Sequence, residues 1–179
     1  MMQVMSSNVD WSRASPGPSL LAIYDEALPQ VYGYLLPRCG NATLAEDLTA
    51  ETFLAAVSAV KRDKVPHLSV AWLVGVARHK LVDHWRRQTR EDRKLQLAHD
   101  EQADVVDPWD AQIDLVQAQA VLARLGPHHR AALTLRYLDG LSVPEAAEHL
   151  DRTVHATEAL LVRARAAFRR IYEEGSDDD

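Results

Sequence analysis

The sequence predicts an all-α protein in which two small helical domains are joined by an acidic, flexible linker. Strand signals are nearly absent, because no alternating β-branched run occurs and no Asn-Gly or Asp-Gly turn separates such runs. Residues typical of helix starts recur along the chain. An acidic stretch with Pro108 and weak periodicity divides the helical regions. The predicted organisation is a disordered lead-in over 1–18, a first domain over 19–95, a linker over 96–112, a second domain over 113–173 and an acidic tail over 174–179.

Two helices are predicted in the first half of the first domain. Leu20–Leu36 forms a helix that Pro29 interrupts, because proline lacks the amide proton needed in a helix interior. The second helix starts at Thr43, where Thr-Leu-Ala-Glu forms a capping box with Glu46, and it runs to about Val60.

A long third helix coincides with a strongly basic segment. It follows a loop at 61–68, is capped by Ser69 and runs to about Lys94. The net charge of the chain is −6, yet residues 78–94 hold seven basic residues against three acidic ones. A second basic segment, 152–170, holds five against one. Local patches of this kind determine DNA affinity, so the acidic total does not exclude a nucleic-acid-binding protein.

The second domain ends in a predicted helix-turn-helix. Helices are expected from about Ile113 to Gly126 and from Pro127 to Asp139, with Gly140 as a left-handed stop. Ser142 opens a short helix through the capping box Ser-Val-Pro-Glu, and a last helix runs from Thr153 to about Tyr172.

Small and turn-forming residues stand at the helix-turn-helix positions that need them. Ala146 and Ala147 permit a close helix crossing, and Asp151 tolerates the left-handed turn conformation. Thr157 stands where Val or Ile is usual. Because the second helix of such a motif enters the major groove, its first turns are expected to contact DNA. The residues involved are Arg152, Thr153, His155, Glu158, Ala159, Arg163 and Arg165. The alternative is a helical hairpin with a solvated basic face.

Nothing in the sequence indicates an enzyme, a metal site or a cofactor. Cys39 is the only cysteine, and no Gly-rich phosphate loop occurs. No apolar run approaches the roughly 18 residues that cross a membrane, and residues 1–18 lack the features of a signal peptide. We therefore expect a cytoplasmic protein with no catalytic residues, no cofactor and no membrane insertion.

Three groups of motifs resemble those of extracytoplasmic-function sigma factors of the sigma-70 family. Ala45-Glu-Asp-Leu-Thr-Ala-Glu-Thr-Phe-Leu54 resembles their polymerase-binding helix, and the segment Ala71 to Arg87 resembles their promoter-melting helix. The segments Leu122-Ala-Arg-Leu-Gly-Pro, Leu135 to Glu145 and Ala159 to Arg165 resemble their upstream-element domain. The resemblance implies a region 2-like first domain and a helix-turn-helix, region 4-like second domain.

The resemblance implies a role for one acidic helix face. Asp47, Ala50, Glu51 and Leu54 recur at helical spacing and share that face. In the family this face docks on core RNA polymerase. A merely solvated face is the alternative.

Two promoter-binding surfaces are also implied. Strand opening requires cations for phosphates and surfaces on which unstacked bases rest. The residues expected at the minus-10 element are Arg78, His79, Lys80, Asp83, Trp85, Arg86 and Arg87. The loop 61–69 is expected to hold an extruded base, and the helix-turn-helix residues are expected at the minus-35 element. For Trp72 and Trp85, burial in the core is the stronger alternative.

The partners implied are core RNA polymerase, promoter DNA and an anti-sigma factor. Two other classes stay open on the residues alone. A stand-alone dimeric helix-turn-helix regulator would bind an operator without polymerase, and a helical adaptor would bind only protein.

Overall fold

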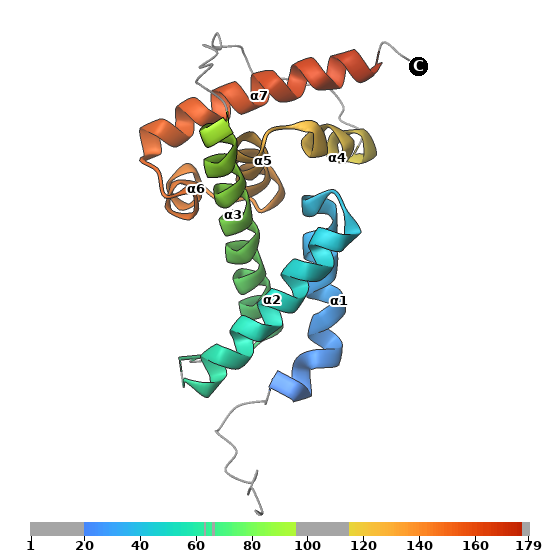
Figure 1. The fold of residues 1–179 in the computed structure, drawn as a ribbon, viewed down its shortest axis with the longest axis vertical. Helices are drawn as coiled ribbons and strands as arrows, with labels where there is room; N and C mark the ends of the chain where they lie inside the picture. Colours follow the sequence, from blue (N-terminus) through green and yellow to red (C-terminus); the bar gives the residue numbers. More distant parts are fainter. Residues whose placement is uncertain (1–19, 63, 66, 96–114, 177–179) are drawn as a thin grey trace, which may run out of the picture.

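The computed structural model describes residues 20–62, 64–65, 67–95 and 115–176 of the chain (Figure 1). Within these ranges every regular element is helical and no strand occurs, which confirms the all-α prediction. The elements are α1 (Leu20–Cys39), α2 (Ala42–Lys61), α3 (Val70–Leu95), α4 (Leu115–Arg124), α5 (Pro127–Leu133), a π-helical segment (Thr134–Leu138), α6 (Val143–Leu150) and α7 (Val154–Ser176). The predicted linker lies outside the described residues.

The first domain is a three-helix unit in which α1, α2 and α3 contact one another. Helix α1 continues through Pro29, so the predicted interruption is wrong. Pro29 and Asp25, whose carbonyl would accept the missing hydrogen bond, both lie on an exposed face, where water can replace that bond.

The start of α2 also differs from the prediction. The N-cap is Asn41, whose side-chain oxygen accepts a hydrogen bond from the Leu44 amide at 2.7 Å, and Thr43 already lies inside the helix. Gly40 turns the chain immediately before it, with φ +75. The predicted cap of α3 is confirmed, because the Trp72 amide donates to the Ser69 hydroxyl at 3.2 Å.

The helix-turn-helix forms as predicted from α6 and α7. Ser142 and Glu145 make the reciprocal capping box, and Asp151 adopts the left-handed conformation with φ 54 and ψ 49. Ala146 is fully buried at the crossing. Thr157 is buried too, and its hydroxyl donates to the Thr153 carbonyl at 3.0 Å, which satisfies the polar atom at this otherwise apolar position.

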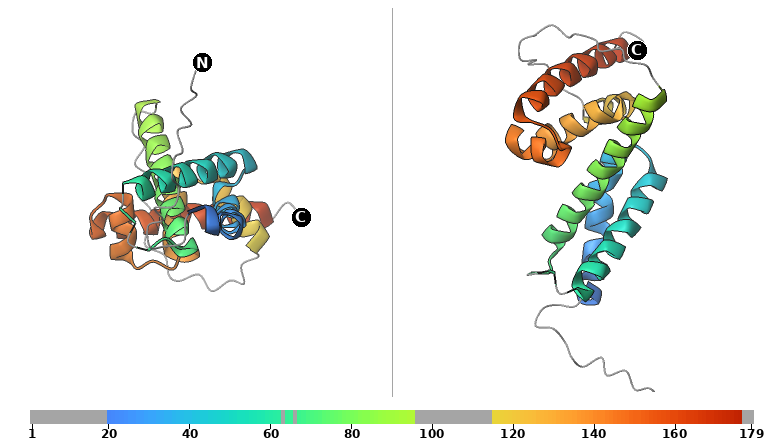
Figure 2. Two further views of the ribbon diagram at one scale, coloured as in Figure 1. Left: turned by 90° about the horizontal axis from the view of Figure 1, so that it is seen from below. Right: turned by 60° about the vertical axis from the view of Figure 1, so that its left-hand side comes forward.

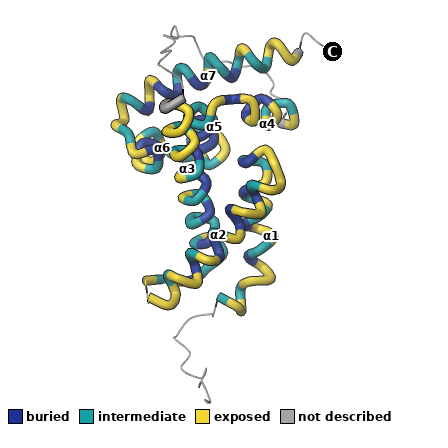
Figure 3. The backbone as a smooth tube through the Cα atoms, in the orientation of Figure 1, coloured by how far each residue is buried: buried dark blue, intermediate teal, exposed yellow. Residues whose placement is uncertain are grey.

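The two domains pack against each other. Helix α3 runs from α1 and α2 up to α5 and α6, while α7 lies across the far end of the second domain (Figures 1 and 2). Buried residues occur along α3 and in α5 (Figure 3), and one apolar cluster of buried residues includes members of both domains. Among the described helices, none is long and apolar enough to span a membrane.

His129 on α5 is expected to make folding stability depend on pH. Burial, assisted by the charges of His128, Arg163 and Arg170, lowers the pKa of His129 from 6.5 to about 4. The unfolded chain therefore binds this proton near pH 6.5, whereas the folded chain binds it only near pH 4. Stability should be fully present above about pH 6.5 and should fall as the pH drops towards 4. Urea unfolding across this window should show the fall, and His129→Gln should reduce it; an identical pH dependence in the variant would contradict this assignment.

Candidate nucleic-acid interface

Six of the residues predicted to contact the minus-10 element lie on α3 and are exposed or half-buried. We call this set the α3 stripe, and its members are Arg78, His79, Lys80, Asp83, Arg86 and Arg87. Arg87 is exposed, and Asp83 lies 3.6 Å from Arg86. Lys80 lies 3.5 Å from Glu51 of α2. The stripe thus combines free and paired charges on one helix.

Trp85 does not belong to this surface. Trp85 is 1 % exposed, so in this structure its side chain is not available to DNA. Leu81 precedes it by one helical turn and is buried as well, which places both residues on the face that packs into the core. Trp72 is partly buried and packs against the same core cluster.

The beginning of α7 presents the predicted helix-turn-helix residues to solvent. Thr153, His155, Glu158 and Ala159 are all exposed. The Thr153 hydroxyl accepts a hydrogen bond from the Ala156 amide at 3.1 Å, so this residue caps α7.

The arginines around α7 differ in exposure. Arg165 is exposed and donates to the Tyr137 hydroxyl at 3.1 Å. Arg152 and Arg163 are half-buried. A surface with exposed polar groups at the helix start and arginines beside it suits a major groove and its phosphates.

The predicted docking face lies on α2 of the first domain (Figure 1). Asp47, Ala50 and Leu54 are exposed, and Leu54 retains 67 % of its accessible surface. Glu51 is half-buried beside Lys80. Two carboxylates flanking an exposed leucine form a mixed acidic and apolar surface.

Asp139 was not predicted to be a functional residue. The sequence predicted it only as the end of a helix, before the stop at Gly140. Its carboxylate is 1 % exposed and contacts Tyr34, Arg38 and Arg78 of the first domain. These partners lie 61 to 105 positions away, so no local pattern indicates the contact.

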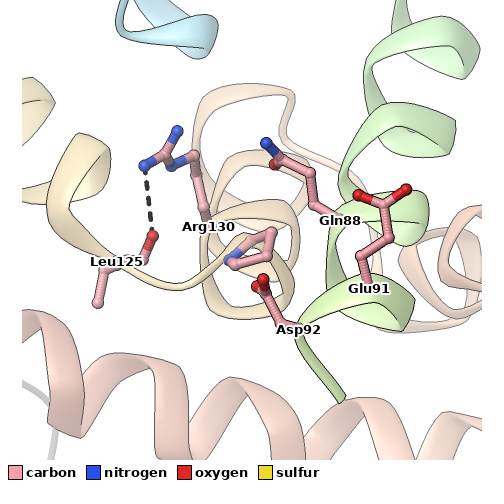
Figure 4. A pocket seen from close by; sticks show the side chains of 6 residues that line it. Gln88, Glu91, Asp92, Leu125 and Arg130 are labelled. Carbon is pink, nitrogen blue, oxygen red and sulfur yellow. Dashed lines mark hydrogen bonds between the residues drawn. The ribbon is translucent and has the colours of Figure 1, made fainter. Parts of the chain in front are cut away.

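A cleft between α3 and the α4–α5 turn shows no sign of a ligand site (Figure 4). Gln88, Glu91 and Asp92 face it from α3. Across it, the Arg130 guanidinium donates to the carbonyls of Leu122, at 2.7 Å, and Leu125, at 3.3 Å, and so caps the end of α4. Within the described ranges, no group of three or more His, Cys, Asp or Glu side chains could hold a metal ion.

Comparison with known protein families identifies both domains. Residues 23–91 match the family model of Sigma-70 region 2, and residues 115–168 match that of Sigma-70, region 4. The chain belongs to the sigma-70 family of RNA polymerase sigma factors. The first match contains the α2 docking face and the α3 stripe, and the second contains the helix-turn-helix.

Relatives of this sigma factor belong to the extracytoplasmic-function (ECF) group. It is 35 % identical over 125 residues to the ECF RNA polymerase sigma factor SigC of Mycobacterium tuberculosis, a match that covers 69 % of this chain and 68 % of that protein. It is 30 % identical over 175 residues to the ECF RNA polymerase sigma factor BldN of Streptomyces coelicolor. That match covers 93 % of this chain but 65 % of BldN, so the chain spans slightly less than two thirds of that relative.

A solved structure supports the fold. The sigma factor RpoE, crystallised in complex with the anti-sigma factor NepR from Bartonella quintana, aligns with a TM-score of 0.52 and 21 % sequence identity. The alignment covers 86 % of this sigma factor and 94 % of that chain.

Proposed function

We propose that this chain binds core RNA polymerase and directs transcription initiation at specific promoters, and that it catalyses no reaction itself. The main support for the proposal is that one chain contains both sigma regions, region 2 and region 4. In each region most of the residues predicted to contact a partner are exposed or half-buried. In this role the α2 docking face holds the chain on polymerase. The α3 stripe then binds the opened minus-10 element, and the start of α7 binds the minus-35 element.

Neither DNA surface is expected to bind a promoter tightly alone. Affinity for DNA rises with the number of phosphates neutralised, and each surface offers few cations. When polymerase holds both domains on one promoter, the first contact raises the effective concentration of the second. Promoter binding by the holoenzyme should therefore be far tighter than binding by the free chain.

Charge suggests how the helix-turn-helix distinguishes bases. Glu158 is exposed at the start of α7 and can accept a hydrogen bond from a cytosine amino group. The same carboxylate repels phosphates, so it restricts the docking poses that the motif tolerates. His155 lies 3.9 Å from Glu158 and can orient that side chain.

We also propose cytoplasmic action and regulation by an anti-sigma protein that covers one or both domains. Family membership supports both statements, since sigma factors work with polymerase on chromosomal DNA. The RpoE structure contains such an inhibitor, NepR.

In vitro transcription tests the proposal. Purified bacterial core RNA polymerase is supplied with a library of genomic fragments, with and without this chain, and the 5′ ends of the transcripts are mapped. Discrete start sites that require the chain are expected. Transcripts that are identical in both reactions would overturn the proposal.

A further inference from the structure

An exposed tyrosine outside the helix-turn-helix contacts an arginine of α7. Tyr137 lies in the π-helical segment and is 57 % exposed, so burial in the core does not explain an aromatic residue here. Its hydroxyl accepts a hydrogen bond from Arg165 Nη1 at 3.1 Å, although 28 positions separate the two residues. The guanidinium carbon of Arg136 lies 6.0 Å from the centroid of the Tyr137 ring, at the limit of cation–π range. The phenol is therefore close to two guanidinium groups.

The backbone around Tyr137 forms a π-helical turn. The Asp139 amide donates to the Thr134 carbonyl at 3.0 Å, a bond that spans five residues instead of the four of an α-helix. Thr134 is buried and Tyr137 is exposed, so the chain leaves the core within this turn. The Arg136 guanidinium donates to the Leu141 carbonyl at 2.9 Å, which holds the end of the turn in place. Turns of this kind occur frequently at functional sites.

Arg165 shares a face of α7 with Glu158. Seven residues bring an α-helix to within about 20° of its starting direction and advance it by about 10.5 Å. Both side chains are exposed. The major groove is about 12 Å wide, so when the start of α7 lies in the groove, a residue two turns later on the same face lies near the phosphates at its edge. Contacts to phosphates fix the position of a protein on the duplex, whereas contacts to base edges read the sequence.

The hydrogen bond to Tyr137 holds Arg165 without neutralising its charge. Arg38 and Arg86 are each paired with a carboxylate at 2.8 Å, whereas the partner of Arg165 is an uncharged phenol. A guanidinium carries five N–H donors in a fixed fork, so one donor can bind Tyr137 while others stay available to a phosphate. A side chain that is already held in one orientation loses less conformational entropy when it binds. The contact therefore prepares Arg165 for an anionic ligand.

We propose that Tyr137 is a positioning residue for DNA binding, which orients Arg165 so that its guanidinium binds a backbone phosphate beside the minus-35 element. The identity of that element rests on the proposed function, but the ligand itself, a phosphate diester of duplex DNA, occurs in every sequence. Arg165 then contributes affinity, and base selection belongs to the first turns of α7. Tyr137 touches no base and acts only through Arg165.

A double-mutant cycle in DNA binding tests the proposal. The variants are Tyr137→Phe, which removes the hydroxyl and keeps the ring, Arg165→Ala, and the two combined. Both side chains are exposed, so neither substitution opens a cavity in the core, and circular dichroism checks that each variant folds. Tyr32→Phe on α1 is the control, because the Tyr32 hydroxyl forms no hydrogen bond within the described part of the chain.

The probe is a fluorescein-labelled DNA duplex of mixed sequence. Its Kd for the full chain is read by anisotropy at several salt concentrations. Binding of the holoenzyme to a dependent promoter, binding of the chain to core polymerase and in vitro transcription are measured in parallel.

We expect Arg165→Ala to weaken duplex binding by about 10-fold, because it removes a charge-assisted contact. It should also reduce the slope of log Kd against log salt by about 0.9, the value for one phosphate. Tyr137→Phe should weaken binding by about 2- to 10-fold, the range for one hydrogen bond, and it should have no further effect once Arg165 is removed. Both losses should be similar on promoter and mixed-sequence duplexes, since phosphates are common to both. Tyr32→Phe should change neither quantity.

Several outcomes separate this proposal from the proposed function. If Tyr137→Phe or Arg165→Ala matches the natural chain in duplex affinity, the role of Tyr137 is overturned, even when transcription is normal. It is also overturned if Tyr137→Phe weakens binding equally with and without Arg165. Reduced binding to core polymerase with unchanged duplex affinity would overturn it too, because the exposed ring would then belong to a protein-binding surface. If the two residues are coupled but no protein supports transcription, the phosphate site stands and the proposed function fails.

Discussion

Asp47→Arg is expected to reduce transcription from dependent promoters by about 100-fold or more. Asp47 is exposed on the α2 docking face, one turn before Glu51, and forms no ion pair with the described part of the chain. Placing a cation where a partner is complementary to an anion costs several kcal/mol, and about 2.8 kcal/mol already corresponds to 100-fold. The measurement is in vitro transcription over a titration of the variant against core polymerase.

Glu173→Arg provides the charge-matched control for that experiment. Glu173 is exposed near the end of α7, in the second domain, and is not part of the α2 docking face. This variant carries the same change in net charge and should support near-normal transcription. Equal losses in both variants would show that bulk charge, and not this face, determines the effect.

Trp85→Ala is expected to lower the free energy of unfolding by about 3–5 kcal/mol, because it removes a large side chain from a closely packed site. Trp85 is 1 % exposed and packs in the core cluster with Leu81 and Leu73. A loss of this size is a large part of the stability of a small domain. Urea unfolding monitored by far-ultraviolet circular dichroism measures it without depending on tryptophan fluorescence.

Two further variants sharpen the assignment of Trp85 to the core. Trp85→Phe should cost less, since most of the apolar volume remains. Arg87→Ala, two residues along on the exposed surface, should change stability by only about 0.5 kcal/mol or less. If Trp85→Ala had near-normal stability but had lost DNA binding, Trp85 would belong to the nucleic-acid surface and not to the core.

Local chemistry explains why much of the fold could be predicted from the sequence. The capping box of Ser142 and Glu145 and the left-handed Asp151 both depend on groups within a few positions of one another. The start of α2 was predicted less well because Asn41 and Thr43 are both good N-caps. Gly40 adopts the left-handed conformation immediately before Asn41, so the N-cap is Asn41 and not Thr43.

The candidate site was predictable only where neighbours along one helix define it. The α2 docking face and the exposed start of α7 follow from helical spacing. The burial of Trp85 depends on which face of α3 meets the other helices, and basic residues flank that tryptophan closely enough to suggest a DNA surface. The contacts of Asp139 join it to side chains from α1 and α3, although Asp139 itself follows the π-helical segment, and no sequence pattern connects these residues.

A stand-alone operator-binding regulator explains less of the molecule. It would use α6 and α7 but would leave the region 2 match, the α2 docking face and the α3 stripe without a role. A purely protein-binding adaptor would leave the exposed start of α7 and Arg165 unexplained.

Permanganate and nuclease footprinting of a dependent promoter tests the central claim most directly. With core polymerase and this chain together, we predict protection around the minus-35 element and reactive, unpaired thymines around the minus-10 element. Omission of either component should remove both signals. A symmetric footprint over a palindrome, produced by the chain without polymerase and lacking unpaired thymines, would contradict the account.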